Sequence, residues 1–119
     1  MKNVKKYSEI LSTLVREEAV KYKDDSEGFS TVPITDTKHH QYLVVIHGFR
    51  DFSRFYAIQY HFEIIDGKVW IQRDITDIAI HEELVKKGIP KEDIVLGYKA
   101  EYARYLSGYG VDNEKSIAA

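Results

Sequence analysis

The sequence predicts a single α+β domain: an antiparallel β-sheet meander with an N-terminal helix and a second helix packed on the sheet. Three observations favour this fold. They are an Asp66-Gly67 turn between apolar runs, a helical apolar period near the N-terminus, and a change of period after Asp74. Nine tyrosines and five phenylalanines against one methionine also favour sheet. A chain of 119 residues can build one core and is too short for two.

The first expected element is an amphipathic helix over residues 3–22. Its apolar side chains recur with helical spacing and form one stripe: Val4, Tyr7, Ile10, Leu11, Leu14, Val15 and Ala19. A polar run closed by Gly28 ends this helix. We therefore expect the helix to lie on the sheet with its apolar stripe inward.

Two strands are predicted next. Residues 29–36 contain Pro33, which has no N–H to donate to a neighbouring strand, so this strand should lie at a sheet edge. Residues 39–48 are apolar on both faces, which predicts a central strand covered on both sides. One face holds Tyr42, Val44 and Ile46, and the other holds Leu43, Val45 and His47.

A long hairpin, strands 54–65 and 68–74, follows from the Asp66-Gly67 pair, because a type I′ turn needs positive φ at both positions. This register pairs Glu63 with Trp70 and continues with His61 opposite Gln72 and Tyr60 opposite Arg73. One face then holds Ile58, Phe62, Ile64, Val69 and Ile71. The other holds Gln59, His61, Glu63, Lys68, Trp70 and Gln72, so one large indole lies on a polar face.

The period changes to helical after residue 74. A helix is expected over residues 75–87, capped by Asp74 or Thr76 and ended at Gly88. Pro90 begins a further turn, and tyrosines at 98, 102, 105 and 109 approach helical spacing. Residues 112–119 are expected to form a disordered tail, which leaves residues 1–111 as the folded domain.

Composition narrows the function classes. The net charge of −2 gives no overall attraction to nucleic acid or to a membrane surface. The absence of cysteine excludes disulfides and thiolate zinc sites. No apolar run is long enough to span a bilayer, and the charged residues 1–6 do not resemble a signal peptide. We expect a cytoplasmic protein without a membrane partner.

Catalytic and metal motifs are missing. His39 and His40 are adjacent and would point to opposite faces of a strand, and His81 has no second histidine four residues on. There is no nucleophile elbow and no phosphate-binding glycine loop. We therefore expect no catalytic residue, no metal site and no cofactor. A metal-dependent nuclease-like enzyme using Glu63, Asp74 and Asp77 remains as an alternative.

DNA binding is a second alternative. Phosphate contacts require clustered positive charge. The arginines that could make them are scattered along the chain: Arg50, Arg54, Arg73 and Arg104. This pattern predicts at most weak DNA binding.

Aromatic side chains outside the predicted core favour a partner surface, because such residues are enriched at interfaces. Together with the polar face of the hairpin, they define the expected partner-binding residues: Trp70, His61, Glu63, Tyr98, Tyr102 and Arg104. The alternative is that the C-terminal segment folds over this face and uses these residues as a second layer of core.

Two blocks of sequence carry a resemblance to a known family. Residues 66–72 read DGKVWIQ and residues 88–98 read GIPKEDIVLGY. With the preceding helix and strand patterns, the chain resembles the XisI family, the fdxN-element excision controlling factors of cyanobacteria. It differs from the family pattern at Asp77, where glutamate is usual, and at Lys99 and Glu101, where histidine and proline are expected.

The resemblance implies a non-enzymatic accessory factor in programmed, site-specific DNA excision. Such a factor works with a separate recombinase and with a companion protein of XisH type that has a nuclease-like fold. The expected partner is therefore this companion, with DNA contacted only weakly or indirectly. The aromatic residues Trp70 and Tyr102 also make a second copy of the chain a possible partner.

Overall fold

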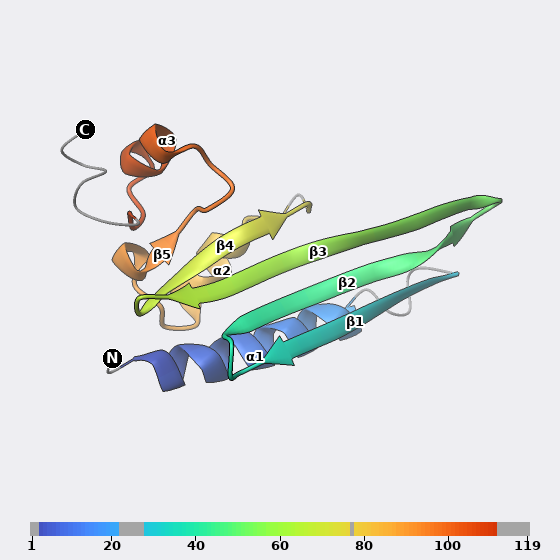
Figure 1. Ribbon diagram of the computed structural model, residues 1–119, viewed down its shortest axis with the longest axis horizontal. Helices are drawn as coiled ribbons and strands as arrows, with labels where there is room; N and C mark the ends of the chain where they lie inside the picture. The colour runs from blue at the N-terminus through green and yellow to red at the C-terminus, as the bar shows by residue number, and fades with distance from the viewer. Residues whose placement is uncertain (1–2, 22–27, 77, 112–119) are drawn as a thin grey trace.

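The computed structural model describes residues 3–21, 28–76 and 78–111. Its strands form one five-stranded sheet in the order β1-β2-β3-β4-β5, antiparallel except for the parallel β4–β5 pair (Figure 1). The elements are α1 (Val4–Lys21), β1 (Phe29–Asp36), β2 (Gln41–Arg50), β3 (Ser53–Ile65), β4 (Lys68–Asp74), α2 (Ile80–Lys86), the 3-10 turn η1 (Lys91–Asp93), β5 (Ile94–Val95) and α3 (Glu101–Leu106). The predicted α+β class and meander are confirmed.

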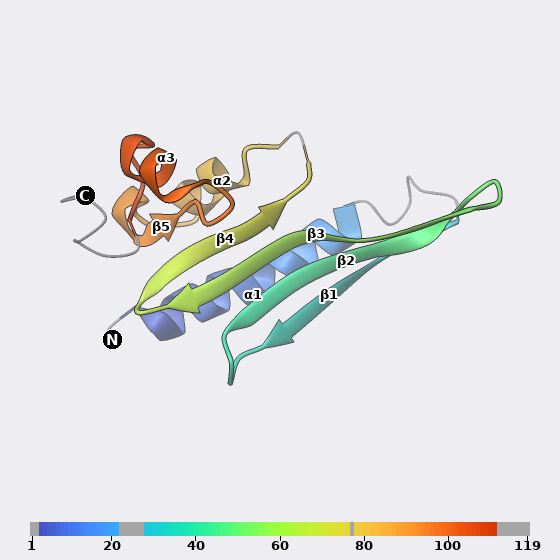
Figure 2. The same cartoon turned by 45° about the horizontal axis from the view of Figure 1, so that its top comes forward.

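Helix α1 lies across one face of the sheet, here called the inner face (Figures 1 and 2). The predicted stripe supplies most of its buried side chains, which join the sheet and the segment around α2 in one core: Tyr7, Leu11, Leu14, Val15, Ala19, Tyr42, Val44, Tyr60, Phe62, Val69, Ile71, Ile80, Leu84 and Ile89. The opposite side of β1, β2 and β3 is here called the outer face. None of the described helices covers it (Figure 2).

The β3–β4 hairpin turns at the predicted residues. Asp66 has φ 51° and Gly67 has φ 77°, which are the positive values that a type I′ turn needs. Glu63 pairs with Trp70 as expected. Between His61 and Phe62 the register shifts by one, so His61 pairs with Arg73 and not with Gln72. The predicted pairs are therefore correct only between the turn and Phe62.

A second irregularity lies in the pairing of β2 with β3. Val44 pairs with Tyr60 and Val45 pairs with Ile58, so Gln59 is an extra residue in β3. Tyr60 points into the core, whereas Ile58 is half-buried outside it. The predicted placement of Ile58 on the core face is wrong, and Gln59, predicted on the polar face, is buried. A β-bulge reverses the alternation of faces and leaves no mark in an apolar pattern.

Strand β1 forms the sheet edge that Pro33 predicts. β2 begins at Gln41 and not at His39, because residues 37–40 form the turn before it. The far ends of β2 and β3, with the connection between them, project beyond the rest of the molecule (Figure 1). We call residues 46–57 the arm. It contributes to a longest dimension of 50 Å against 28 and 24 Å for the other two.

Helix α2 begins at Ile80, later than the predicted start at residue 75. Asp74 Oδ1 accepts hydrogen bonds from the Thr76 N–H at 2.9 Å and the Thr76 hydroxyl at 2.6 Å. Such local bonds offer the backbone a non-helical alternative, so these residues form a turn, and neither caps the helix. The predicted end is confirmed, since the helix is followed by Gly88 with φ 109°.

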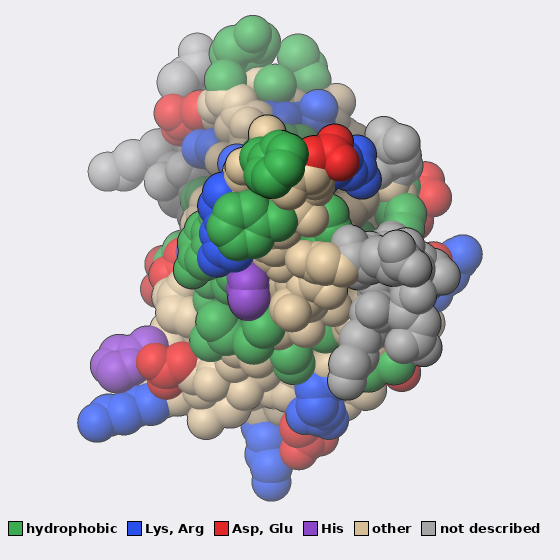
Figure 3. Space-filling model, turned by 90° about the vertical axis from the view of Figure 1, so that its right-hand side faces the viewer, with side chains coloured by type: hydrophobic (Ala, Val, Ile, Leu, Met, Phe, Trp, Pro, Cys, Tyr) green, Lys and Arg blue, Asp and Glu red, His purple; other side chains and the backbone are tan. Residues whose placement is uncertain are grey.

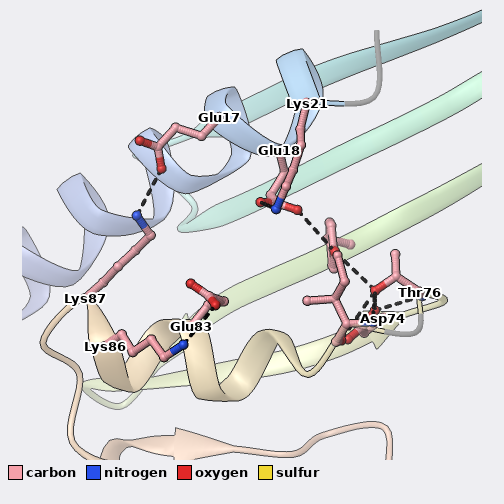
Figure 4. A network of polar contacts seen from close by, with 10 residues as sticks. Glu17, Glu18, Lys21, Asp74, Thr76, Glu83, Lys86 and Lys87 are labelled. Atoms are coloured by element: carbon pink, nitrogen blue, oxygen red, sulfur yellow. Dashed lines mark hydrogen bonds and ion pairs between the residues drawn. The ribbon is translucent and has the colours of Figure 1, made fainter. Parts of the chain in front are cut away.

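A network of polar contacts connects the Asp74–Thr76 turn to helix α1 (Figure 4). Glu18 is 6% exposed and forms an ion pair with Lys21 at 3.4 Å. The Tyr60 hydroxyl lies 3.3 Å from Glu18 Oε1 and 3.1 Å from Thr76 Oγ1, which in turn bonds Asp74. The network therefore joins the C-terminal end of α1, the middle of β3 and the segment before α2.

The C-terminal third adds elements that the sequence pattern did not predict. Pro90 precedes η1 as expected, but Ile94 and Val95 then form β5 beside β4. Helix α3 contains only two of the four regularly spaced tyrosines. Asp77 and the predicted tail at 112–119 lie outside the described residues. Within the described ranges, no helix has both the length and the apolar character needed to cross a membrane.

Candidate partner-binding site

The predicted partner-binding residues lie near one end of the outer face, and we call them the Trp70 site: His61, Glu63, Trp70, Tyr98, Tyr102 and Arg104. Backbone pairing places Gln41, Glu63, Trp70 and Val95 side by side across β2, β3, β4 and β5. His61 lies on the same face two residues along β3. The remaining members follow β5 in the chain. Arg104 lies over Trp70, so the fold brings four members of the predicted set to one region: His61, Glu63, Trp70 and Arg104.

The strand part of the Trp70 site is a hydrogen-bonded network centred on Glu63. The Gln41 amide donates to Glu63 Oε2 at 2.7 Å, and the Gln72 amide donates to Glu63 Oε1 at 3.2 Å. His61 Nε2 lies 2.7 Å from Gln41 Oε1. Burial lowers the pKa of His61, and the Glu63 charge opposes this shift only in part. Because the amide oxygen of Gln41 can only accept, His61 Nε2 donates this hydrogen bond.

The indole of Trp70 lies on the outer side of the sheet but is partly covered by the C-terminal segment. The Arg104 guanidinium lies 5.4 Å from the ring centroid, a cation–π distance. Gly97 also comes close, since a Cβ there would lie 2.9 Å from Trp70 Cε3. Trp70 is half-buried as a result. The C-terminal segment thus covers part of the indole, as the alternative expects, whereas Tyr98 and Tyr102 remain exposed.

The C-terminal segment is exposed on its far side. Tyr102 and Leu106, four residues apart on α3, are 75% and 76% exposed, and Tyr98 is 47% exposed. Residues at i and i+4 share one face of a helix, so these two side chains form an apolar ridge. The tyrosine spacing did not predict Leu106, because the series continues from Tyr102 to position 105 and does not include position 106. Burial raises the pKa of Tyr98, with the negative charge of Asp74 adding to the shift.

Two residues of the nuclease alternative, Glu63 and Asp74, lie on different faces of the sheet, and the third, Asp77, lies outside the described residues. Asp74 pairs with Tyr60, which points into the core, whereas Glu63 lies on the outer face. The oxygens of Glu63 are already bonded by the two glutamines. Across residues 3–21, 28–76 and 78–111, no group of three or more histidine and carboxylate side chains is arranged to hold a metal ion.

The arginines also lie apart. Arg50 and Arg54 are on the arm, where they contact the aromatic rings of Phe29, Phe49 and Tyr56. Arg73 Nε donates to the Ile58 carbonyl at 2.7 Å, and Arg104 covers the indole. These four side chains therefore do not form one basic patch of the kind that phosphate binding requires.

Comparison with known proteins gives consistent results. A protein-family model described as "XisI protein" matches residues 1–111. A crystal structure of a XisI-like protein from Anabaena variabilis is 37% identical, with a TM-score of 0.84 over 91% of this chain and 98% of that chain. The structure of fdxN element excision controlling factor XisI from the same organism is 26% identical, with a TM-score of 0.78 over 91% and 97%. Among curated proteins there is no match.

Proposed function

Since the chain belongs to the XisI protein family, we propose that it is a non-enzymatic controlling factor in programmed site-specific DNA excision, acting through a companion protein of XisH type. A relative of the same fold is itself described as an excision controlling factor. The proposal assigns cutting and rejoining of DNA to other proteins. This chain would supply the surface that recruits or regulates them.

The exposed ridge of Tyr102 and Leu106 is the observation that carries the choice of surface. It lies on a helix anchored by Arg104, whose guanidinium covers Trp70 and whose Nη1 donates to the Lys99 carbonyl at 2.8 Å. Large side chains with an apolar body and a polar tip contribute strongly to interfaces when a partner covers them. The half-buried indole, in contact with Arg104, then supports this ridge.

Interface energetics set the expected size of the effect. Removing a tyrosine side chain at the centre of an interface typically costs about 2 kcal/mol or more, which is roughly a thirtyfold loss of affinity. The Tyr102→Ala variant should therefore bind the companion much more weakly. Its fold should be retained, because Tyr102 is 75% exposed and makes no part of the core.

Titration calorimetry with the purified companion measures this difference. Tyr56→Ala is the matched control, since Tyr56 is another tyrosine, 67% exposed, at the opposite end of the molecule. Wild-type affinity in the control and weakened affinity in Tyr102→Ala would support the proposal. Equal affinities in all three proteins would place the companion elsewhere.

A further inference from the structure

The outer face carries an aliphatic patch, defined as Val32, Ile34, Leu43, Val45 and Ile58. Val32, Val45 and Ile58 lie side by side across β1, β2 and β3, and Ile34 pairs with Leu43 two residues further along. Val32 is 38% exposed and Ile34 is 44% exposed, and no described helix lies over them. Sheet faces of this composition normally pack against another layer.

Two charged residues of β3 lie at opposite ends of this face. Glu63 pairs with Gln41, which is four residues before Val45 on β2, and Arg54 pairs with Phe49, four residues after it. At ~3.3 Å per residue, each charge is about 13 Å along the strands from the middle of the patch. Along β3, the outer face therefore has a carboxylate at one end, aliphatic side chains in the middle and a guanidinium at the other end, with Arg73 beside His61 on the neighbouring β4.

The arm extends the apolar surface. Phe49 and Tyr56 are 55% and 67% exposed, and the Arg54 guanidinium lies 5.1 and 5.7 Å from their ring centroids. Figure 3, which looks at the molecule from the arm end, shows hydrophobic side chains gathered beside Lys and Arg side chains. At ~200 Å² for an aromatic side chain, the two rings expose about 240 Å². The aliphatic patch adds to this area mainly through Val32 and Ile34, so the exposed apolar surface runs from the patch onto the arm.

We propose that the outer face forms a homodimer interface, in which a second copy packs face to face with its strands reversed. The two-fold axis would lie in the plane between the two sheets, perpendicular to the strands, and would pass near Val45. Arg54 then lies opposite the partner's Glu63, and the symmetry repeats this contact on the other side. A two-fold axis parallel to the strands would instead bring equal charges together. The charges of Arg54 and Glu63 thus favour the arrangement with reversed strands. They also favour a second copy as the partner, because the same face carries both members of the charge pair.

This interface goes beyond the proposed function, since it uses β1, β2, β3 and the arm and leaves the α3 ridge uncovered. The two proposals are tested separately by measuring whether the companion binds a variant that no longer dimerises, such as Val32→Lys. The companion should still bind when the outer face is disrupted, and the dimer should still form in Tyr102→Ala.

Analytical ultracentrifugation over a range of concentrations tests the dimer. Val32→Lys should be monomeric, because it places two lysines near the axis within the aliphatic patch. Val20→Lys is the matched control, since Val20 is 68% exposed on α1, on the other side of the sheet, and this variant should remain dimeric. A wild type that stays monomeric at roughly 100 μM, where a dimer of micromolar affinity would be formed, would overturn the proposal. So would a dimer that persists in Val32→Lys.

Charge reversal tests the orientation. Arg54→Glu alone and Glu63→Arg alone should each weaken dimerisation by about tenfold or more, because two symmetric attractions become repulsions. Mixing the two variants should restore association as a heterodimer, since each chain then carries the charge that the other lacks. Circular dichroism checks that both variants are folded. If the mixture associates no better than either variant alone, the reversed arrangement is wrong.

Discussion

Replacing Tyr7 with phenylalanine tests how much a hydrogen bond between helix α1 and the C-terminal third of the chain contributes to stability. The Tyr7 side chain is 1% exposed, and its hydroxyl donates to Asp93 Oδ2 at the end of η1. Phenylalanine keeps the ring and its packing, so only the hydrogen bond is lost. A hydrogen bond to a charged group contributes ~1.5–3 kcal/mol to stability. We therefore expect the free energy of unfolding of Tyr7→Phe to fall by about 2 kcal/mol.

The same contact predicts a dependence on pH. Burial raises the pKa of Tyr7 to about 12, from 10.0 for an ordinary tyrosine, and the hydrogen bond and charge of Asp93 add to the shift. The folded protein thus holds this proton more tightly than the unfolded chain. Its stabilising contribution is complete below pH 10.0 and is lost as the pH rises towards 12. In Tyr7→Phe this loss is absent, so the two stability curves should converge in that range.

Urea unfolding followed by circular dichroism measures both effects. The control is Tyr102→Phe, because that hydroxyl belongs to a side chain that is 75% exposed and its removal should change stability by less than about 0.5 kcal/mol. Equal stability of Tyr7→Phe and the wild type near neutral pH would show that the hydrogen bond between Tyr7 and Asp93 does not stabilise the fold. A difference that stays constant up to pH 12 would refute the assignment of the titration to Tyr7.

Two glycines give further predictions. A Cβ on Gly48 would lie 2.1 Å from the Gly28 carbonyl oxygen and 2.8 Å from Phe29 Cα, so Gly48→Ala should force β1 away and lower stability by about 2–4 kcal/mol, measured by thermal unfolding. Gly97→Ala should push the C-terminal segment off Trp70. Because the chain has one tryptophan, its fluorescence reports this change directly, and the emission should move to longer wavelength. An unchanged spectrum would show that the segment does not depend on this close approach.

Local chemistry accounts for the elements that the sequence predicts well. The Asp66-Gly67 turn requires only two residues with positive φ between apolar runs, and the α1 stripe requires only a period. Both signals lie within a few residues of the structure they specify. The same holds for Pro33, whose missing donor places β1 at an edge.

The failures come from interactions between distant segments. The two β-bulges arise from pairing between strands, and the one between β2 and β3 moves Ile58 to the outer face. β5 has only two residues, and its place beside β4 depends on the preceding helix and turn. The cover over Trp70 likewise comes from Arg104, 34 positions along the chain. None of these can be predicted from the apolar period within one segment.

The two edges of the sheet have a consequence for growth of larger assemblies. Pro33 interrupts the free hydrogen-bonding row of β1, and β5 offers just two residues before a bridge between Val95 and Gly110 occupies its far side. Both borders are therefore poor templates for adding strands from further molecules. Growth by strand addition is thus disfavoured at both edges, which favours association through side-chain surfaces, where it can close after a defined number of copies.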